Sequence, residues 1–322
     1  MQYYDRLSII ISQEIDMGKD PESFIAMLIG LHLLSLEKHG IHSIIEDAIL
    51  SDYTNYTQEH RYNTLFEGRK QTLKKADGTS MTFTLKKIIF RQPRIIGWDT
   101  CVIEATAEDC EEWKGVETVV KISWQAKSHS SEKDFMDDVK KAVDKDHASH
   151  HWVADHLPNI LLSQDFEMAK DSPQARLKEY FDTASYVDGD SFKYESRVCH
   201  IMVREKLYLI TSLCEPRHYA QGIFDILQVH RWVYDHARII HRDISMTNLM
   251  WRKRNGVICG VLNDFDLSSR HDRESASALR RTGMGPYLAC DLLKEDLPVH
   301  IYRHDIESIF NVLVLLCCSN KV

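Results

Sequence analysis

The segment from residue 239 to residue 266 constrains the fold of this chain more than any other stretch. Asn255 and Gly256 stand there between two apolar runs, and both tolerate the positive φ angles that a type I′ turn requires at its central positions. We therefore expect a β-hairpin with a two-residue loop. A loop of that length fixes the register, so Arg254 should pair with Val257.

Polar side chains should meet at the open end of this hairpin. In the expected register Asn248 faces Asn263, and Asp264 follows directly after that pair. Asp243 lies five residues before Asn248, in a loop that must turn back from the preceding helix. Two carboxylates and one amide should therefore lie close together.

These side chains suit metal-assisted phosphoryl transfer, because Mg²⁺ prefers oxygen ligands and is usually shared between carboxylates and substrate phosphates. The order is His-Arg-Asp, then Asn after four residues, then an apolar hairpin and Asp-Phe. This is the order of the catalytic and metal-binding loops of protein kinases. In kinases one Asp and one Asn hold metal, while a second Asp accepts the substrate proton.

Length and charge narrow the possible functions. The chain has 322 residues, of which 43% are hydrophobic, with only 13 Gly and 7 Pro, so it can bury a large core and form two lobes or domains. Its net charge of −8 argues against broad binding to nucleic acid or anionic membranes, which need a positive field. The longest apolar run, 309–318, is too short to span a bilayer.

The cysteines and the N-terminus favour an intracellular protein, in the cytoplasm or the nucleus. The eight cysteines form no CxxC pair and lie mostly inside apolar runs, as is typical of buried, reduced thiols. The N-terminal sequence MQYYDRLSIII has no basic region followed by a long apolar stretch and a cleavage site, so we expect no secretion signal.

The middle of the chain should form an antiparallel sheet. Stretches rich in β-branched residues predict three strands, at residues 81–90, 94–105 and 116–124. Residues 165–196 are polar and show no sustained period, so we expect a long insertion with at most one short helix there.

Apolar spacing predicts three helices around this sheet. The first begins at Pro21 with Asp20 as its N-cap, buries its apolar residues and ends near Gly40. The other two span residues 131–147 and 219–237, and the last of them leads directly into the loop of Asp243.

With these elements in this order, the chain resembles the protein-kinase superfamily and, more closely, the fungal-type protein kinase (FunK) family over most of its length. The resemblance is carried by the stretches YDRLSIIIS, DPESFIAMLIGL, VVKISW, HRDISMTN, GVLNDFDLSS, RTGMGPYLACDLL and RHDIESIF. It implies an α+β, two-lobed fold with a small antiparallel-sheet lobe and a mainly helical large lobe. We expect a family-specific N-terminal region over residues 1–90, the small lobe over 91–204 and the large lobe, truncated at its C-terminus, over 205–322.

The resemblance implies roles for the predicted loop residues. Asp243 would be the catalytic base, preceded by Arg242, while Asn248 and Asp264 would hold Mg²⁺. ATP would bind between the two lobes.

Lys121 follows two valines at the position where a kinase places the lysine that pairs with the α- and β-phosphates of ATP. Strand alternation should turn it away from the packed face that Val120 enters, and the alternative is an ordinary strand lysine at the surface. A helix must supply an acid to hold this lysine. The resemblance points to Glu132, with Asp137 and Asp138 as competing candidates.

The phosphate-covering loop matches the family pattern poorly. Gly97, Trp98, Asp99 and Thr100 stand where a kinase has a glycine-rich motif. Backbone amides near Gly97 and Thr100 can still cradle phosphate, with weaker ATP binding than usual.

Three further positions depart from or complete the pattern. Asp266 replaces the Gly of Asp-Phe-Gly, and Asp adopts left-handed torsions only at some steric cost. Asp291 replaces a Glu whose arginine partner, in a later helix, should be missing because the sequence stops at Val322. Asp305 matches the buried aspartate that accepts hydrogen bonds from the catalytic-loop backbone, or it is an ordinary helix N-cap.

Two side hypotheses follow from local clusters. Phosphorylation between Leu267 and Thr282 could order this polar loop through a contact with Arg242, or the loop could simply be mobile. The candidate serines are Ser268, Ser269, Ser275 and Ser277. His147 and His151, one helical turn apart, invite a zinc site, although a solvated helix end explains them more economically.

The sequence therefore predicts a protein kinase that uses ATP and Mg²⁺ to phosphorylate Ser or Thr hydroxyls of protein substrates, with no nucleic-acid or membrane partner. A pseudokinase scaffold that binds nucleotide without turnover is one alternative, favoured by the degenerate glycine loop and Asp266. A small-molecule phosphotransferase, which shares the Asp, Asn and later Asp, is the other.

Overall fold

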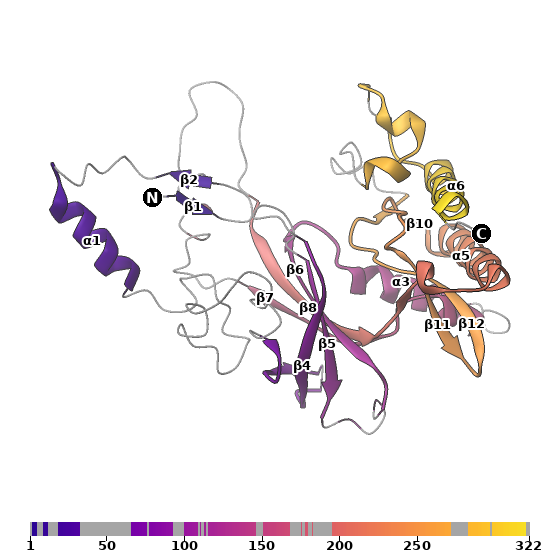
Figure 1. The fold of residues 1–322 in the computed structure, drawn as a ribbon, viewed down its shortest axis with the longest axis horizontal. Coiled ribbons are helices and arrows are strands. Elements are labelled where there is room, and N and C mark those ends of the chain that lie inside the picture. Colours follow the sequence, from indigo (N-terminus) through magenta and orange to yellow (C-terminus); the bar gives the residue numbers. More distant parts are fainter. Residues whose placement is uncertain are drawn as a thin grey trace. The chain divides into compact units, whose positions relative to one another are not determined.

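The fold is that of a computed structural model (Figure 1). The structure describes residues 2–4, 9–11, 19–32, 66–75, 77–92, 100–108, 110, 113, 115–145, 151–167, 175, 178–179, 182, 195–271, 283–296 and 298–319.

The chain forms two compact units. The first, which we call the sheet unit, comprises Met1–His129 and Ile160–Lys206, and the second, the helical unit, comprises Ser130–Asn159 and Leu207–Val322. These limits differ from the expected ones. The expected limit after residue 90 falls inside β4 (Ser80–Arg91), and residues 130–159 group with the C-terminal part of the chain.

A six-stranded sheet dominates the sheet unit (Figure 1). Its order is β3-β4-β5-β6-β8-β7, and every neighbouring pair is antiparallel. The strands are β3 (Lys70–Lys74), β4, β5 (Cys101–Ala107), β6 (Thr118–Ala126), β7 (Ile160–Glu167) and β8 (Arg197–Glu205). The three predicted antiparallel strands are confirmed as β4, β5 and β6, although β5 begins at Cys101. Most of the predicted insertion at 165–196 lies outside the described residues.

Alternating side chains build the core of this sheet. Ile103, Val120 and Val203, on three neighbouring strands, are fully buried. Lys121 follows Val120 on β6, is only 2% exposed and lies opposite Met202 of β8. A lysine this deeply buried is unusual, because its ammonium group must leave water.

The N-terminal helix α1 (Pro21–His32) begins as expected, because the N–H of Ser23 donates to the side chain of Asp20 at 3.1 Å. The prediction that its apolar residues are buried is wrong for Ile25 and Ile29, which are each 53% exposed. Periodicity shows that residues share a face, but not that anything covers it. The predicted end of this helix lies outside the described residues, and a separate ribbon pairs β1 (Gln2–Tyr4) with β2 (Ile9–Ile11).

The helical unit is built around α5 (Pro216–Ala237), which buries Ile226, Val229 and Val233 in one core. The helices that accompany it are α3 (Glu132–Lys145), η3 (His151–His156), η4 (Ile210–Ser212), η6 (Gly285–Tyr287), η7 (Cys290–Leu293) and α6 (Tyr302–Ser319). The strands are β9 (Tyr208–Leu209), β10 (Ile239–Ile240), β11 (Leu249–Arg254), β12 (Val257–Leu262) and β13 (Ser269–Arg270). The helices predicted at 131–147 and 219–237 correspond to α3 and α5.

The predicted hairpin is confirmed as β11 and β12. Arg254 pairs with Val257, and the two loop residues between them have φ angles of 48° and 84°. At the open end the N–H of Asn263 donates to the carbonyl oxygen of Asn248 at 3.0 Å. The side chain of Asn248 and the residues after Asn263 are therefore brought to the same end, as the register required.

The cysteines differ from expectation. All eight are free thiols, but only Cys199 is buried, whereas Cys214, Cys290, Cys317 and Cys318 are exposed. The prediction of mostly buried thiols is therefore wrong. Among the described residues, no helix combines the length and the apolar character that a bilayer span requires.

Candidate active site

The loop between β10 and β11 is built on the buried imidazole of His241. Its Nε2 lies 3.0 Å from the carbonyl oxygen of Asn263, and the backbone N–H of Asp243 donates to its Nδ1 at 3.3 Å. These partners require the neutral tautomer in which Nε2 carries the proton. Burial lowers the pKa of His241 and so favours this neutral form, which fixes the backbone of Asp243.

Asp305 anchors the same loop from α6. Its carboxylate accepts the N–H of His241 at 2.8 Å and the N–H of Arg242 at 3.1 Å, which confirms the role expected for it. The Nε2 atoms of His230 and His300 lie 3.0 and 2.8 Å from the two carboxylate oxygens. Burial alone would raise the pKa of Asp305, but hydrogen bonds from the two imidazoles hold it well below its usual range. Since Asp305 is the fourth residue of α6, it is not the helix N-cap.

The side chains of Asp243 and Asn248 are in direct contact. The Nδ2 of Asn248 donates to the carbonyl oxygen of Asp243 at 2.8 Å and to its Oδ2 at 3.0 Å. Both contacts use the amide nitrogen, so the amide oxygen is the atom that can face a cation. Burial raises the pKa of Asp243 to about 7, with the negative charges of Asp264 and Asp266 adding to the effect.

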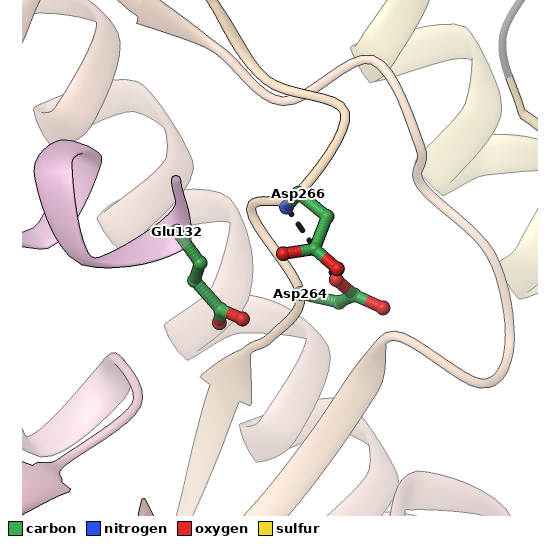
Figure 2. Close-up of side chains that lie close together, drawn as sticks. All are labelled: Glu132, Asp264 and Asp266. Atoms are coloured by element: carbon green, nitrogen blue, oxygen red, sulfur yellow. Dashed lines mark hydrogen bonds between the residues drawn. The ribbon is translucent and has the colours of Figure 1, made fainter. Parts of the chain in front are cut away.

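Three acidic side chains converge in the same unit (Figure 2), and the charges of two of them, Asp264 and Asp266, act on Asp243. The carboxylates of Glu132, Asp264 and Asp266 place one oxygen each within 4.8 Å of the others. Glu132 opens α3, whereas the two aspartates lie in the loop after β12 (Figure 2). Glu132 and Asp266 are buried, and buried like charges at this separation favour a bound cation or proton.

The backbone torsions of this loop differ from expectation. Asp264 has a left-handed φ of 69°, whereas the φ of Asp266 is not positive. The torsional cost expected at Asp266 therefore does not arise. The N–H of Asp266 points back to Oδ1 of Asp264 at 3.4 Å (Figure 2). Asp266 thus adds a carboxylate to the site, and the only sequence signal for it was its place in Asp-Phe-Asp.

The two competing candidate acids of α3, Asp137 and Asp138, pair with basic side chains instead. Asp137 pairs with a lysine of its own helix at 2.5 Å, and Asp138 pairs with Arg270 at 2.5 Å. Of the three candidate acids, only Glu132 joins the acidic cluster. Lys121 belongs to the sheet unit and Glu132 to the helical unit, and their pairing stays a prediction.

The phosphate-covering loop is described only in part. Gly97 lies outside the described residues, and the carbonyl oxygen of Thr100 accepts the N–H of Gln92 at 2.9 Å. The contribution of Gly97 and Thr100 to nucleotide binding therefore stays a prediction as well.

The donor set of the helical unit fits a hard divalent cation. Asn248 offers an amide oxygen, and Asp264 and Asp266 offer carboxylate oxygens that lie close together. Oxygen ligands of this kind suit Mg²⁺ rather than a softer metal. By contrast, Nδ1 of His156 lies 2.7 Å from the carbonyl oxygen of Gly260, and His151 is exposed. His147 lies outside the described residues, and the described histidines form no zinc-binding group.

The segment that follows the acidic loop returns to Asp243. Gly283 has a φ of 97°, and a Cβ built there would lie 2.9 Å from Leu288 and 3.3 Å from the carbonyl oxygen of Arg242. Only glycine combines this torsion with this close approach. Gly283 therefore lies directly beside the loop of Asp243.

Asp291 accepts hydrogen bonds from Lys294 at 2.7 Å and from Arg303 of α6 at 2.6 Å. It therefore has an arginine partner in this helix, and the expected loss of a partner from a later helix stays a prediction. Ser268 is only 2% exposed and donates to the carbonyl oxygen of His241 at 3.3 Å, which makes it a poor phosphorylation site. Ser269 lies in β13, and the other two candidate serines lie outside the described residues.

The sequence profile described as fungal protein kinase matches residues 1–317. The chain belongs to the fungal protein kinase family. The resemblance inferred from the sequence motifs is thus confirmed, and a kinase-like α+β fold is expected of every member. Among solved structures, this family member is similar to a ROP18 kinase domain in complex with AMP-PNP and sucrose, with 13% identity, 78% of this chain and 68% of that chain covered, and a TM-score of 0.43. No curated protein sequence matches it.

Proposed function

We propose that this member of the fungal protein kinase family transfers the γ-phosphoryl group of ATP to Ser or Thr hydroxyls of protein substrates. The observation that carries the proposal is the contact between Asp243 and Asn248 beside the acidic pair Asp264 and Asp266. The helical unit thus holds both a proton acceptor and oxygen ligands for a divalent ion, and phosphoryl transfer requires both.

Asp243 serves as the base that accepts the proton of the attacking hydroxyl. Its pKa of about 7 makes it a stronger acceptor than an ordinary carboxylate and matches it to neutral conditions. The amide of Asn248 orients its carboxylate, and the N–H groups that bind Asp305 fix the backbone before it. Arg242 thus supports catalysis through its backbone, which Asp305 holds in place before Asp243.

Asn248, Asp264 and Asp266 would hold Mg²⁺. When bound, this ion neutralises charge on the transferred phosphoryl group. We assign Lys121 to the α- and β-phosphates and Glu132 to the orientation of Lys121 on the family resemblance. Gly97 and Thr100, placed in the loop that covers the phosphates, complete the nucleotide contacts of the proposal.

A scaffold without turnover is the second candidate. The glycine loop is degenerate, and Asp266 adds negative charge close to Asp264, where a kinase has an uncharged glycine. Both features would weaken nucleotide binding or catalysis without affecting the fold.

Phosphate transfer from labelled Mg-ATP to casein and, in a separate arm, to small alcohols tests these functions. We expect label on Ser and Thr of the protein, and Asp243→Asn should lower kcat by about 100-fold or more. The same variant should retain its thermal stabilisation by Mg-ATP, because it keeps the metal ligands. Asp264→Asn should lose that stabilisation.

Each alternative has its own signature in this experiment. Label on small alcohols alone would identify a small-molecule phosphotransferase. Stabilisation by Mg-ATP with no transfer to either acceptor would identify a scaffold. Neither transfer nor stabilisation would refute nucleotide chemistry altogether.

A further inference from the structure

Arg270 connects the segment after the acidic loop to α3. It lies four residues after Asp266, and its Nε and Nη2 donate to the same oxygen of Asp138 at 2.8 and 2.5 Å. Its Nη1 donates to the hydroxyl of Ser130 at 2.9 Å, and its guanidinium carbon lies 5.0 Å from the ring centroid of Phe135. One side chain therefore contacts Ser130, which precedes α3, and two residues of α3 itself, Phe135 in the first turn and Asp138 in the middle of the helix.

The backbone of Arg270 is fixed independently of these contacts. Arg270 pairs with Ile239, and Ser269 pairs with Ile240, in the short ribbon of β10 and β13. The next residue, His271, donates its N–H to the carbonyl oxygen of Arg238 at 2.7 Å. β10 leads directly into the loop of Asp243, so Arg270 extends from the strand that pairs with the start of that loop.

Two of the contacted residues, Ser130 and Phe135, flank Glu132 along the chain. Ser130 precedes it, and Phe135 follows one helical turn later on the same buried face of the helix. A reciprocal cap between Ser131 and Asp134, with contacts of 2.8, 2.9 and 3.3 Å, makes this first turn rigid. A displacement of the turn would therefore move the carboxylate of Glu132 as well.

The contacts of Arg270 are stronger than those of a typical surface ion pair. The side chains of Arg270 and Asp138 are only 25% and 29% exposed, so solvent screens them partly. The planar guanidinium reaches two partners and stacks on Phe135 at once, which a lysine ammonium cannot do. By comparison, Lys141, the other partner of Asp138 at 3.1 Å, is 70% exposed.

We propose that Arg270 is a positioning residue, which holds the first turn of α3 so that Glu132 faces Asp264 and Asp266. The inference rests on the proposed function for its consequence in catalysis, but not for its structural part. Arg270 touches none of the reacting groups. It acts by setting the distance between an acid on a helix and two acids on a loop (Figure 2).

Arg270→Ala tests the proposal, with Lys141→Ala as the matched control that removes the exposed partner of Asp138. Hydrogen exchange of the amides at 132–145 should become about tenfold faster in Arg270→Ala. The kcat for phosphate transfer should fall about tenfold with a smaller change in the KM for protein substrate. Lys141→Ala should change neither quantity, and Arg270→Lys should restore only part of the loss because it cannot bridge Asp138 and Ser130.

Thermal unfolding of each variant distinguishes a local change from global instability. Unchanged exchange of α3 in a folded Arg270→Ala variant would overturn the proposal. Faster exchange with unchanged kcat and unchanged affinity for Mg-ATP would also overturn it, since Arg270 would then be merely structural.

Failure of the proposed function gives a separate result. If the wild type transfers no phosphate, the affinity for Mg-ATP, measured by titration calorimetry, takes the place of kcat. A loss of about tenfold in Arg270→Ala would support the positioning role. Equal affinities, or no binding to the wild type, would overturn it.

Discussion

Asp243 is subject to opposite demands from function and stability. Its carboxyl group is buried near Asp264 and Asp266, and its pKa is raised to about 7. A raised pKa makes the carboxylate a better proton acceptor, but it also means that the ionised form destabilises the folded state. The ionised carboxylate that is best suited to accept a proton therefore lowers the free energy of unfolding.

Replacing Asp243 by Asn should stabilise the metal-free protein at alkaline pH. In the wild type the folded carboxyl binds its proton more tightly than the unfolded one, so the folded state gains stability as the pH falls through about 7. Asn has no charge to lose. We expect the advantage of the variant to shrink by about 2–3 kcal/mol between about pH 8 and about pH 5, measured by urea unfolding with a chelator present.

Asp138→Asn is the control for this titration. Burial alone would raise the pKa of Asp138, but hydrogen bonds from Arg270 and Lys141 lower it. Its contribution to stability is present above the ordinary carboxyl pKa and is lost only below it, so the effect of this substitution should be the same at both pH values. An equally constant effect for Asp243→Asn would contradict the raised pKa.

Single residues could be predicted where chain spacing alone brings them together. Asn248 and Asp264 followed from a hairpin register that two turn residues determine. The imidazole of His230 reaches Asp305 from α5, a distant part of the chain, and no local pattern links the two residues. The contact of Arg270 with α3 depends on tertiary packing in the same way.

Among the elements, α5 and β12 approach one another unusually closely. A Cβ built on Gly260 would lie 2.0 Å from the carbonyl oxygen of Gly222. Asp225 accepts the N–H of Gly260 at 2.9 Å, and His156 contacts its carbonyl oxygen at 2.7 Å. The hairpin that carries Asp264 is therefore fixed to the helix through the backbone of one glycine.

The two glycines in this contact should respond differently to substitution. Gly260→Ala should destabilise the protein by about 3 kcal/mol or more, because the helix and the strand must separate. In Gly222→Ala the added Cβ comes closest to the end of the Ile210 side chain, at 3.3 Å, and lies at ordinary contact distance, 3.9 Å, from the backbone of Gly260. Alanine favours the helix by about 1 kcal/mol, so the net effect should be small. Urea unfolding of both variants measures the difference, and equal effects would contradict the close approach.

A helix or strand could be predicted where a turn signal or an apolar period within its own sequence determines it. The hairpin, α3 and α5 have clear turn signals or helical periods, whereas β7 and β8 were not predicted, and β8 is buried along most of its length without a regular alternation. The burial of α1 was predicted wrongly because apolar periodicity does not reveal a partner surface. For the same reason, the exposed cysteines of α6 could not be recognised from the apolar run that contains them.

The two units are built from interleaved parts of the chain. The chain leaves the sheet unit after His129, returns after Asn159 and leaves it again after Lys206. Expected limits at residues 90 and 204 assumed that each unit is one continuous stretch. The pairing of β3 with β4 and of β4 with β5 joins residues on both sides of residue 90 in one sheet, and the division by role that was expected there stays a prediction.

Four hydrogen bonds join three other segments of the helical unit to Asp305. Through it α6 is joined to α5, to the catalytic loop and to the stretch before α6. The bonds involve His230, His241, Arg242 and His300. Such a buried, multiply bonded carboxylate is strongly destabilising to alter, because its partners cannot find other acceptors.

Asp305→Asn should therefore destabilise the whole helical unit by about 3 kcal/mol or more at neutral pH, because an amide keeps one acceptor oxygen and directs an NH₂ group at hydrogen-bond donors. The depressed pKa of Asp305 means that its stabilising effect is present above the ordinary carboxyl pKa and is lost only as the pH falls below it. The deficit should thus be the same at about pH 8 and about pH 6. Asp291→Asn, which removes a partly exposed carboxylate of η7 that pairs with Arg303 near the same end of α6, should leave the free energy of unfolding nearly unchanged. Tryptophan fluorescence during urea unfolding reports both variants, and similar small losses for the two would show that Asp305 does not hold these segments together.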